Sequence, residues 1–205
     1  MGITNHFATS IYYESLSKKS SKKFNEDLLD EAYKLRAMDK AGQKWCAKNY
    51  PGGYTSYHSY SELHRMSSTF EKLEKEIKKH VLKFSHHLDY DLSGKTLSMT
   101  DCWVNIMPER VIHPMHLHPV STISGTYYVQ TPKGCSNIIF EDPRLGFFMG
   151  QPPRVSKPKT QNKYYTKVAP EAGKVVLFES WLRHQVDANP TKEDRVSVSF
   201  NYHWM

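Results

Sequence analysis

The chain has 205 residues, which suits one structural domain, or one domain with a sizeable extension. A net charge of +7 favours anionic partners, but no nucleic-acid-binding motif accompanies it, so we interpret the charge as a solvated surface and do not expect nucleic acid as a partner. No apolar run has the length of a membrane span, and no apolar block near the N-terminus resembles a signal peptide. We therefore expect a soluble, cytoplasmic protein with no membrane partner, and a homodimer is compatible with the sequence.

The first part of the chain is predicted to be mostly helix and loop. After a short strand at 7–13, a helix is predicted to begin at Asn25, whose side chain can cap it, and to end near Gly42. Residues 45–60 are rich in aromatic side chains around a Pro-Gly-Gly turn and are predicted to form a loop. This loop is either a wall of a functional site or an aromatic segment that packs on the body.

A second helix is predicted over residues 69–88. Ser68 and Glu71 have the spacing of a capping box, and the pair Glu71–Lys75 has the i,i+4 spacing that supports a helix. Apolar residues then recur in steps of three and four, at Phe70, Leu73, Ile77, Val81, Phe84 and Leu88.

After Gly94 the pattern changes to short strands divided by Pro, Gly, Asn and Asp. Eight strands are predicted, at 96–107, 111–118, 123–130, 137–140, 162–168, 174–178, 183–187 and 195–204. They indicate a double-stranded β-helix, or jelly roll, so that the fold class is mainly β with N-terminal helices (α+β). We expect residues 1–94 to pack on a catalytic core at 95–205 as one structural domain overall. The long loop 142–161 is expected to help the aromatic loop 45–60 shape a substrate pocket.

Two histidines two residues apart, His116 and His118, are the first candidate metal ligands. Side chains at i and i+2 of an extended segment point to the same face, so both rings can reach one ion. Imidazole is a ligand for Fe, Zn, Cu and Ni. His184 follows an apolar strand and a loop, and a jelly roll can place it opposite this pair. Three such ligands would form a facial site with open positions.

The last predicted strand carries polar side chains on one face. Arg195, Ser197, Ser199 and Asn201 alternate with apolar residues in this strand. Burial of such a face is costly unless its groups find partners, and an arginine pairs well with a carboxylate. The combination suggests a chelating dicarboxylate co-substrate next to a metal.

At this point the chain resembles the Fe(II)- and 2-oxoglutarate-dependent dioxygenases. It is most similar to uncharacterised bacterial and phage-type members, which are prolyl-hydroxylase-like. The matching segments are Pro51–Ser56, Trp103–Asn105, His116–Pro119, Ser124–Val129, Phe140–Arg144, Pro170–Phe178, Ser180–Val186 and Arg195–Asn201.

The resemblance implies site residues and an activity. His116 and His184 take the two histidine positions of the family's metal site, and Arg195 takes the position that binds the far carboxylate of 2-oxoglutarate, assisted by Ser197. Tyr128 resembles a tyrosine that contacts the same co-substrate, and Asn105 is expected to line the pocket. The implied reaction consumes 2-oxoglutarate and dioxygen, releases succinate and carbon dioxide, and hydroxylates a small-molecule or peptide substrate that the sequence does not identify.

One position departs from the family pattern. The second residue of the usual motif is Asp or Glu, and here it is His118. His118 is either the third ligand or a neighbour of the metal, in which case His113 or a carboxylate completes the site. The carboxylate candidates by motif position are Glu141, Asp142 and Glu179. Two other functions stay open: a cupin-type metal enzyme that does not use 2-oxoglutarate, and a non-catalytic jelly-roll binding protein.

Overall fold

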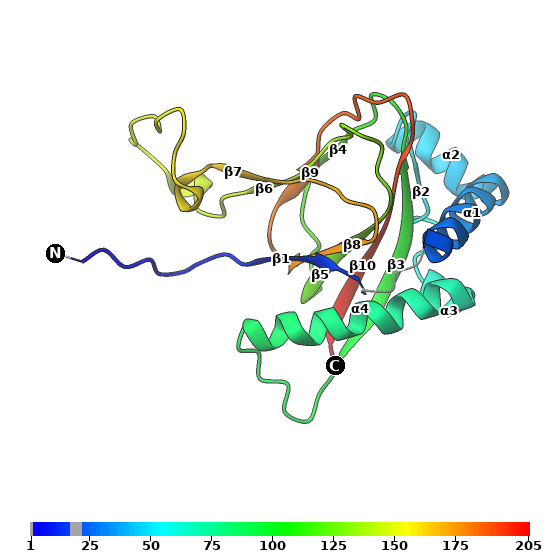
Figure 1. Cartoon of the computed structure of the whole chain (residues 1–205), viewed down its shortest axis with the longest axis horizontal. Helices are drawn as coiled ribbons and strands as arrows, with labels where there is room; N and C mark the ends of the chain where they lie inside the picture. Colours follow the sequence, from blue (N-terminus) through cyan, green and yellow to red (C-terminus); the bar gives the residue numbers. More distant parts are fainter. Residues whose placement is uncertain (1, 17–21) are drawn as a thin grey trace.

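Two antiparallel sheets form the body of the protein in the computed structural model, which describes residues 2–16 and 22–205. The larger sheet has the strand order β1 (Ile11–Ser15), β8 (Lys174–Glu179), β5 (Ile123–Gln130), β10 (Arg195–Trp204), β3 (Leu97–Met107) and β2 (Tyr54–Thr55). The smaller sheet has the order β4 (His113–His116), β9 (His184–Val186), β6 (Ile138–Glu141) and β7 (Tyr165–Val168). The two sheets face each other as the halves of an open barrel (Figure 1). The predicted jelly roll is confirmed.

All eight predicted strands after Gly94 are present, with ends that differ by a few residues. The strands could be predicted because side chains on the two faces of a strand alternate along the sequence, and β10 illustrates this pattern. Val196, Val198 and Phe200 have no exposed surface on one face, whereas Arg195 and Ser197 lie on the other face. The predicted first strand is also present but begins later, at Ile11.

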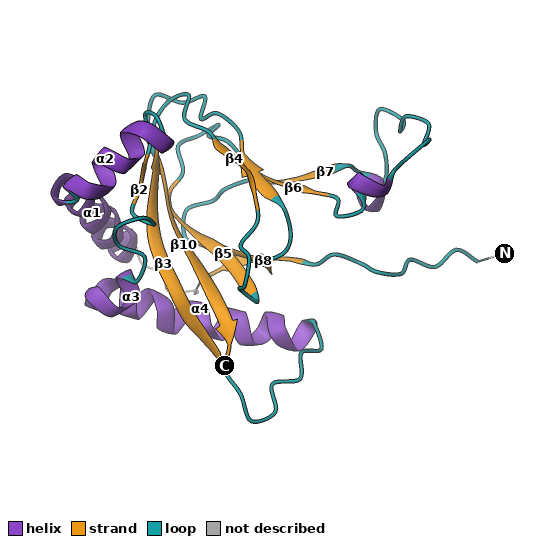
Figure 2. Ribbon diagram, turned by 180° about the vertical axis from the view of Figure 1, so that it is seen from behind, coloured by secondary structure: helices purple, strands orange, loops and turns teal. Residues whose placement is uncertain are grey.

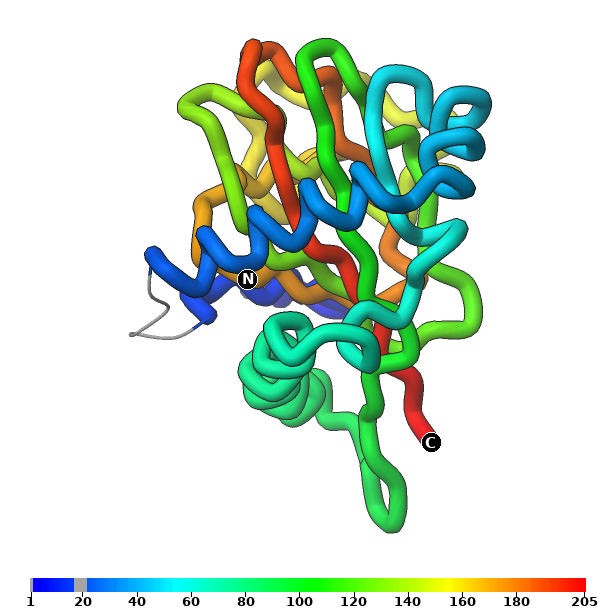
Figure 3. Tube along the Cα trace, turned by 90° about the vertical axis from the view of Figure 1, so that its right-hand side faces the viewer, coloured from blue at the N-terminus to red at the C-terminus, as the bar shows by residue number. Residues whose placement is uncertain are grey.

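Four helices cover the face of the larger sheet that points away from the smaller sheet (Figures 2 and 3). They are α1 (Lys22–Met38), α2 (Lys40–Asn49), α3 (Leu63–Met66) and α4 (Ser68–His87). The apolar stripe predicted for α4 is buried from Phe70 to Phe84, and Lys75 and Glu71 form their ion pair at 2.5 Å. The cap lies one residue earlier than predicted, because the Ser67 hydroxyl accepts a hydrogen bond from the Thr69 amide at 3.1 Å.

The prediction that a helix ends near Gly42 is wrong. The first helix ends at Met38, and Asp39 caps a new helix by accepting a hydrogen bond from the Gly42 amide at 2.7 Å. A Cβ at Gly42 would collide with the Asp39 carboxylate, so this glycine serves close packing inside α2 rather than helix termination. The predicted loop 45–60 consequently begins with helical residues up to Asn49 and later contains strand β2.

The long loop 142–161 connects β6 to β7 and contains the 3₁₀ turn Leu145–Phe147, with a second turn, Thr160–Asn162, at its end. It projects away from the barrel (Figure 1). It lines neither of the two cavities described below, so the expectation that it shapes a pocket beside the histidines does not hold. None of the helices in residues 2–16 and 22–205 is long and apolar enough to cross a membrane.

Candidate metal centre

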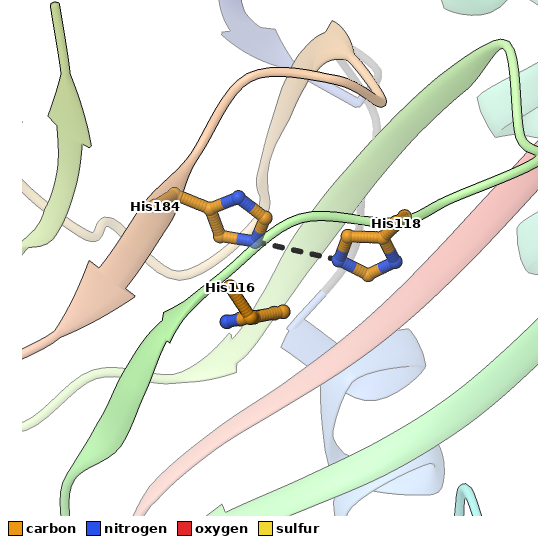
Figure 4. Close-up of side chains that lie close together, drawn as sticks. All are labelled: His116, His118 and His184. Atoms are coloured by element: carbon orange, nitrogen blue, oxygen red, sulfur yellow. Dashed lines mark hydrogen bonds between the residues drawn. The ribbon is translucent and has the colours of Figure 1, made fainter. Parts of the chain in front are cut away.

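Three histidines from the smaller sheet converge on one point (Figure 4). Antiparallel pairing of β4 with β9 places His116 directly opposite His184. His118 follows β4 and is fixed by its own amide, which donates to the Ser180 carbonyl at 3.0 Å. One ring nitrogen from each of the three residues lies within 4.8 Å of the others. This spacing lets all three reach a single ion.

Hydrogen bonds set the orientation of two of these rings. The Nδ1 of His116 lies 2.8 Å from the Pro114 carbonyl oxygen, and the Nδ1 of His184 lies 2.9 Å from the Leu182 carbonyl oxygen. A carbonyl oxygen only accepts, so Nδ1 must carry the proton in both rings. The opposite nitrogen, Nε2, then has a free lone pair, as a metal ligand requires.

Burial keeps the three rings neutral. It lowers the pKa of His184 to about 2, with further lowering by the neighbouring His116, and it lowers the pKa of His118 to about 4. The pKa of His116 is also lowered, mainly by burial. Neutral imidazole is the form that binds a metal. The Nε2 atoms of His118 and His184 lie 3.4 Å apart and form the hydrogen bond drawn as a dashed line in Figure 4. Because the His184 proton is on Nδ1, His118 donates in this bond, and a metal ion bound to both nitrogens would take the place of the shared proton.

The carboxylates proposed as alternative ligands are engaged elsewhere. Glu141 accepts from Arg183 at 2.7 Å, Asp142 from Arg144 at 2.8 Å, and Glu179 from the Tyr90 hydroxyl at 2.9 Å. In the described part of the chain no carboxylate joins the three-histidine group. His113 has its ring centroid 4.7 Å from that of His116, but its ring nitrogens lie outside the group. The structure therefore favours His118 as the third member.

Arg195 lies in the wall of the cavity that also contains the three histidines. Its residue is only 2% exposed, and no carboxylate pairs with it among the residues that the structure describes. Its Nε has no hydrogen-bond partner, and its Nη1 makes long contacts of 3.5 Å to Ser197 Oγ and Met107 Sδ. A buried guanidinium without a carboxylate partner is costly, so an anion bound in this cavity would stabilise it.

The other predicted co-substrate residues surround Arg195. Ser197 on β10 lies opposite Asn105 on β3 and Tyr128 on β5, so the three form one row across the sheet. The Asn105 Oδ1 and the Tyr128 hydroxyl are buried without a partner. The Arg195 guanidinium carbon lies 5.1 Å from the centre of the Tyr128 ring. Asn105 and Ser197 line the cavity, whereas Tyr128 lies behind Arg195 and is not part of the lining.

Tyr50 lies in the aromatic segment 45–60, which the sequence presents as a possible wall of a functional site, but sequence reasoning did not assign it to the region around Arg195. It caps the C-terminus of α2, its ring packs edge-on against His113 with centroids 5.5 Å apart, and its hydroxyl is buried without a partner. Burial raises the pKa of Tyr50, and the positive charge of Arg195 partly offsets that effect. The aromatic composition of 45–60 is the local signal for this segment, whereas the proximity of Tyr50 to Arg195 arises only in the tertiary fold.

Comparison with known proteins agrees with this geometry. A family model described as "Putative 2OG-Fe(II) oxygenase" matches residues 101–201, whereas no curated protein matches the chain. A prolyl-4-hydroxylase from Pseudomonas putida aligns with a TM-score of 0.64 at 12% identity, over 95% of this chain and 92% of that chain. HygX from Streptomyces hygroscopicus, with nickel and 2-oxoglutarate bound, aligns with a TM-score of 0.62 at 13% identity, over 95% and 83%. The viral collagen prolyl hydroxylase of Paramecium Bursaria Chlorella virus-1 aligns with a TM-score of 0.57 at 13% identity, over 93% and 95%.

The solved structures share the fold, and the family model covers the segment that contains the three histidines, Arg195 and Ser197. Members of this family are oxidoreductases that use Fe(II) and 2-oxoglutarate, so the predicted enzyme class, cofactor and co-substrate are confirmed at the level of the family. Through residues 101–201, the chain belongs to the 2OG-Fe(II) oxygenases.

Proposed function

We propose that the protein is an Fe(II)- and 2-oxoglutarate-dependent dioxygenase that hydroxylates a small-molecule or peptide substrate and releases succinate and carbon dioxide. The observation that carries this proposal is the buried Arg195, which has no carboxylate of its own in residues 2–16 and 22–205 and lines the same cavity as three neutral histidines. A metal alone would not require that cation. A dicarboxylate that binds the metal at one end and an arginine at the other end requires both.

The residues present fit such a pair of ligands. His116, His118 and His184 would hold the iron through nitrogen atoms that already lie together. Arg195 would bind the far carboxylate of 2-oxoglutarate, because a guanidinium pairs bidentately with a carboxylate, and the Ser197 hydroxyl would donate a further hydrogen bond. We assign Asn105 to the same pocket, and Tyr128 to support of the guanidinium from behind.

When bound, iron and 2-oxoglutarate supply the oxidative chemistry, in which dioxygen is consumed and the co-substrate loses carbon dioxide. The chain contributes position and environment. Apolar walls from Trp103, Phe178 and Ile138 line the cavity and exclude water, which strengthens the attraction between Arg195 and a carboxylate. Ligation by three neutral histidines leaves one more positive charge at the metal than ligation by two histidines and a carboxylate would.

The solved relatives support both parts of the proposal. HygX was crystallised with a metal and 2-oxoglutarate and also with hygromycin B, a small molecule, and the viral enzyme is a collagen prolyl hydroxylase in complex with 2-oxoglutarate. Small molecules and peptides are thus both represented among proteins with this fold.

The test is an anaerobic titration of the protein with Fe(II) and 2-oxoglutarate. We expect a visible metal-to-ligand charge-transfer band, together with succinate formation once oxygen is admitted. Arg195→Ala should raise the concentration of 2-oxoglutarate needed for the band roughly 100-fold or more, because the lost partner is a buried charge. Ser197→Ala should cause a smaller loss, about tenfold.

Arg110→Ala is the matched control, because Arg110 is an exposed arginine outside the cavity whose side chain is 90% exposed. Its titration should follow that of the wild type. An unchanged band in Arg195→Ala would refute the assignment of Arg195. Iron binding without any succinate formation from 2-oxoglutarate would instead indicate a metal enzyme of the cupin type.

A further inference from the structure

A second cavity adjoins the three histidines, and Arg195 is not among its lining residues. It shares Trp103 and the histidines His113, His116 and His118 with the first cavity, and its other walls come from the segment 45–57, from β3, from residues 117–121 and from the end of β10. Trp103 therefore stands between the two cavities, with its ring centroid 5.7 Å from that of His118. Because this cavity opens next to the histidines and the first one holds the co-substrate residues, the second is the place for the substrate.

The wall of this cavity contains one carboxylate, Asp101. The Asp101 Oδ2 accepts hydrogen bonds from the Thr100 hydroxyl at 2.9 Å and from the Asn201 side-chain amide at 3.3 Å. No lysine or arginine pairs with it in the described part of the chain. Asp101 is partly buried, so its charge is only partly screened by water and would attract a cation strongly.

Aromatic rings lie beside this carboxylate. The rings of Tyr57 and Trp103 have centroids 4.8 Å apart at an angle of 58°, and both residues line the same cavity as Asp101. Burial raises the pKa of Tyr57, and the charge of Asp101 adds to that effect. A carboxylate next to aromatic faces is the environment that binds a cationic nitrogen.

The charged side chains in the linings favour a cation over an anion beside Asp101. No lysine or arginine lines the second cavity, and Asp101 is the one acidic residue among the lining residues of both cavities, all of which the structure describes. An anionic group seated beside Asp101 would meet this carboxylate with no lysine or arginine in the same lining to offset the repulsion, which is unfavourable. Arg195, the one arginine or lysine in either lining, lies in the first cavity.

We propose that the second cavity binds a substrate that carries a cationic nitrogen, seated between Asp101 and the rings of Tyr57 and Trp103, with its carbon skeleton directed toward the three histidines. The chemistry of this subsite is that of an aliphatic ammonium group, supplied either by a small amine or by a lysine side chain of a peptide. That the bound molecule is the substrate rests on the proposed function, whereas the binding of the cation does not.

Three probes of equal length and different charge test the subsite: pentylamine, 1-pentanol and pentanoate. Their binding is measured by quenching of tryptophan fluorescence and by ligand-observed NMR, first on the protein alone and then after anaerobic loading with Fe(II) and 2-oxoglutarate. We expect pentylamine to bind at least tenfold more tightly than the other two probes, because it alone gains a charged hydrogen bond and a cation–π contact. Equal binding of 1-pentanol, tighter binding of pentanoate or no binding of pentylamine would overturn the proposal.

Asp101→Asn removes the charge with little change of shape and should weaken pentylamine binding roughly 10- to 100-fold while leaving 1-pentanol unaffected. Asp187→Asn is the matched control, since Asp187 is exposed, lies outside both cavities and changes the net charge by the same amount. Tyr57→Leu should weaken pentylamine binding about two- to tenfold. Unchanged pentylamine affinity in Asp101→Asn would also overturn the proposal.

Two further comparisons separate the remaining outcomes. A lysine-containing peptide that binds at least tenfold more tightly than pentylamine would identify a peptide as the source of the cation, and the reverse order would identify a small amine. The charge-transfer band with 2-oxoglutarate should be unchanged in Asp101→Asn. If the wild-type protein forms no charge-transfer band but does bind pentylamine, the proposed function is refuted, whereas the proposed cation subsite is still supported.

Discussion

Buried polar atoms without partners identify the site at the level of single residues. The atoms without a partner include the Arg195 Nε, the Asn105 Oδ1 and the hydroxyls of Tyr50 and Tyr128, and all four belong to the region around Arg195. Each such group costs about 1–3 kcal/mol when it is left without a hydrogen bond. A fold tolerates that cost most readily where a ligand removes it. Such atoms also occur at His64, Ser136, Tyr202 and His203, so it is their clustering around Arg195, which lines the cavity of the three histidines, that supports this region as the proposed binding pocket.

His64 is a buried residue of a different kind, and it predicts a pH dependence of stability. It lies in α3, both of its ring nitrogens lack partners, and burial lowers its pKa, with a smaller opposing effect of Glu74. Below about pH 6.5 the unfolded chain gains a proton at this position that the folded protein does not bind. The free energy of unfolding should therefore fall as the pH decreases below that value, by at most about 1.4 kcal/mol per pH unit for this one group.

Urea unfolding of the metal-free protein at pH 7.5 and pH 5.5 measures this effect. His64→Leu should lose less stability between the two pH values than the wild type, because the leucine takes up no proton in either state. His86→Leu, a change at an exposed position of α4, should behave like the wild type. Equal losses in His64→Leu and in the wild type would show that His64 does not contribute.

At the level of elements, Asp39 joins α2 to the segment that lines the substrate cavity. Its side chain is buried and accepts hydrogen bonds from the Gly42 amide, from the Tyr54 hydroxyl at 2.9 Å and from the Ser59 hydroxyl. Asp39→Ala would leave these donors unsatisfied, so we expect a loss of about 2–4 kcal/mol in the free energy of unfolding. Chemical denaturation measures it, and Asp39→Asn, which keeps one acceptor oxygen, should lose less.

Asp30→Ala serves as the control for that prediction, since Asp30 on α1 is exposed and forms only a surface ion pair with Lys34. It should change stability by less than about 0.5 kcal/mol. A loss in Asp39→Ala no larger than that of Asp30→Ala would show that the segment is held by its aromatic contacts instead.

Asp39 also shows why some elements were predictable and others were not. The strands and α4 follow from periodic burial, which a sequence displays directly, as the alternation in β10 and the stripe of α4 illustrate. The break between α1 and α2 depends on the buried carboxylate of Asp39 and on the close packing of Gly42 against it. In the sequence alone, Gly42 indicates a helix end. Tyr50 and Asp101 likewise acquire their environment only when distant strands and loops meet.

The metal centre was predictable for a related reason. An H-x-H pair on an extended segment fixes two ligand directions locally, and the pairing of β4 with β9 supplies the third. The sequence left open whether a carboxylate would replace His118, because Glu141, Asp142 and Glu179 fit the motif positions equally well. In the structure these carboxylates contact Arg183, Arg144 and Tyr90, which supports the proposal that His118 is the third ligand.

For the whole molecule, the division into an N-terminal region at 1–94 and a core at 95–205 stays a prediction, and the outer face of the larger sheet provides its test. Tyr127, Val198 and Phe200 have no exposed surface and alternate with the residues that line the first cavity, so they face the helices. The Tyr127 hydroxyl donates to the Asn25 side chain of α1. Strands β1 and β2, both from the N-terminal region, form the two edges of the larger sheet.

A fragment of residues 95–205 should therefore not fold on its own. Exposure of three large apolar side chains costs roughly 5–9 kcal/mol, which is comparable to the whole stability of a typical domain. Open sheet edges at β8 and β3 would add a tendency to aggregate. We expect weak near-ultraviolet circular dichroism, poor dispersion of amide resonances and strong binding of a hydrophobic dye. A full chain that lacks only the exposed residues 2–8 should retain the native spectra. Native spectra and Fe(II) binding in the 95–205 fragment would instead show that the core is an independent domain.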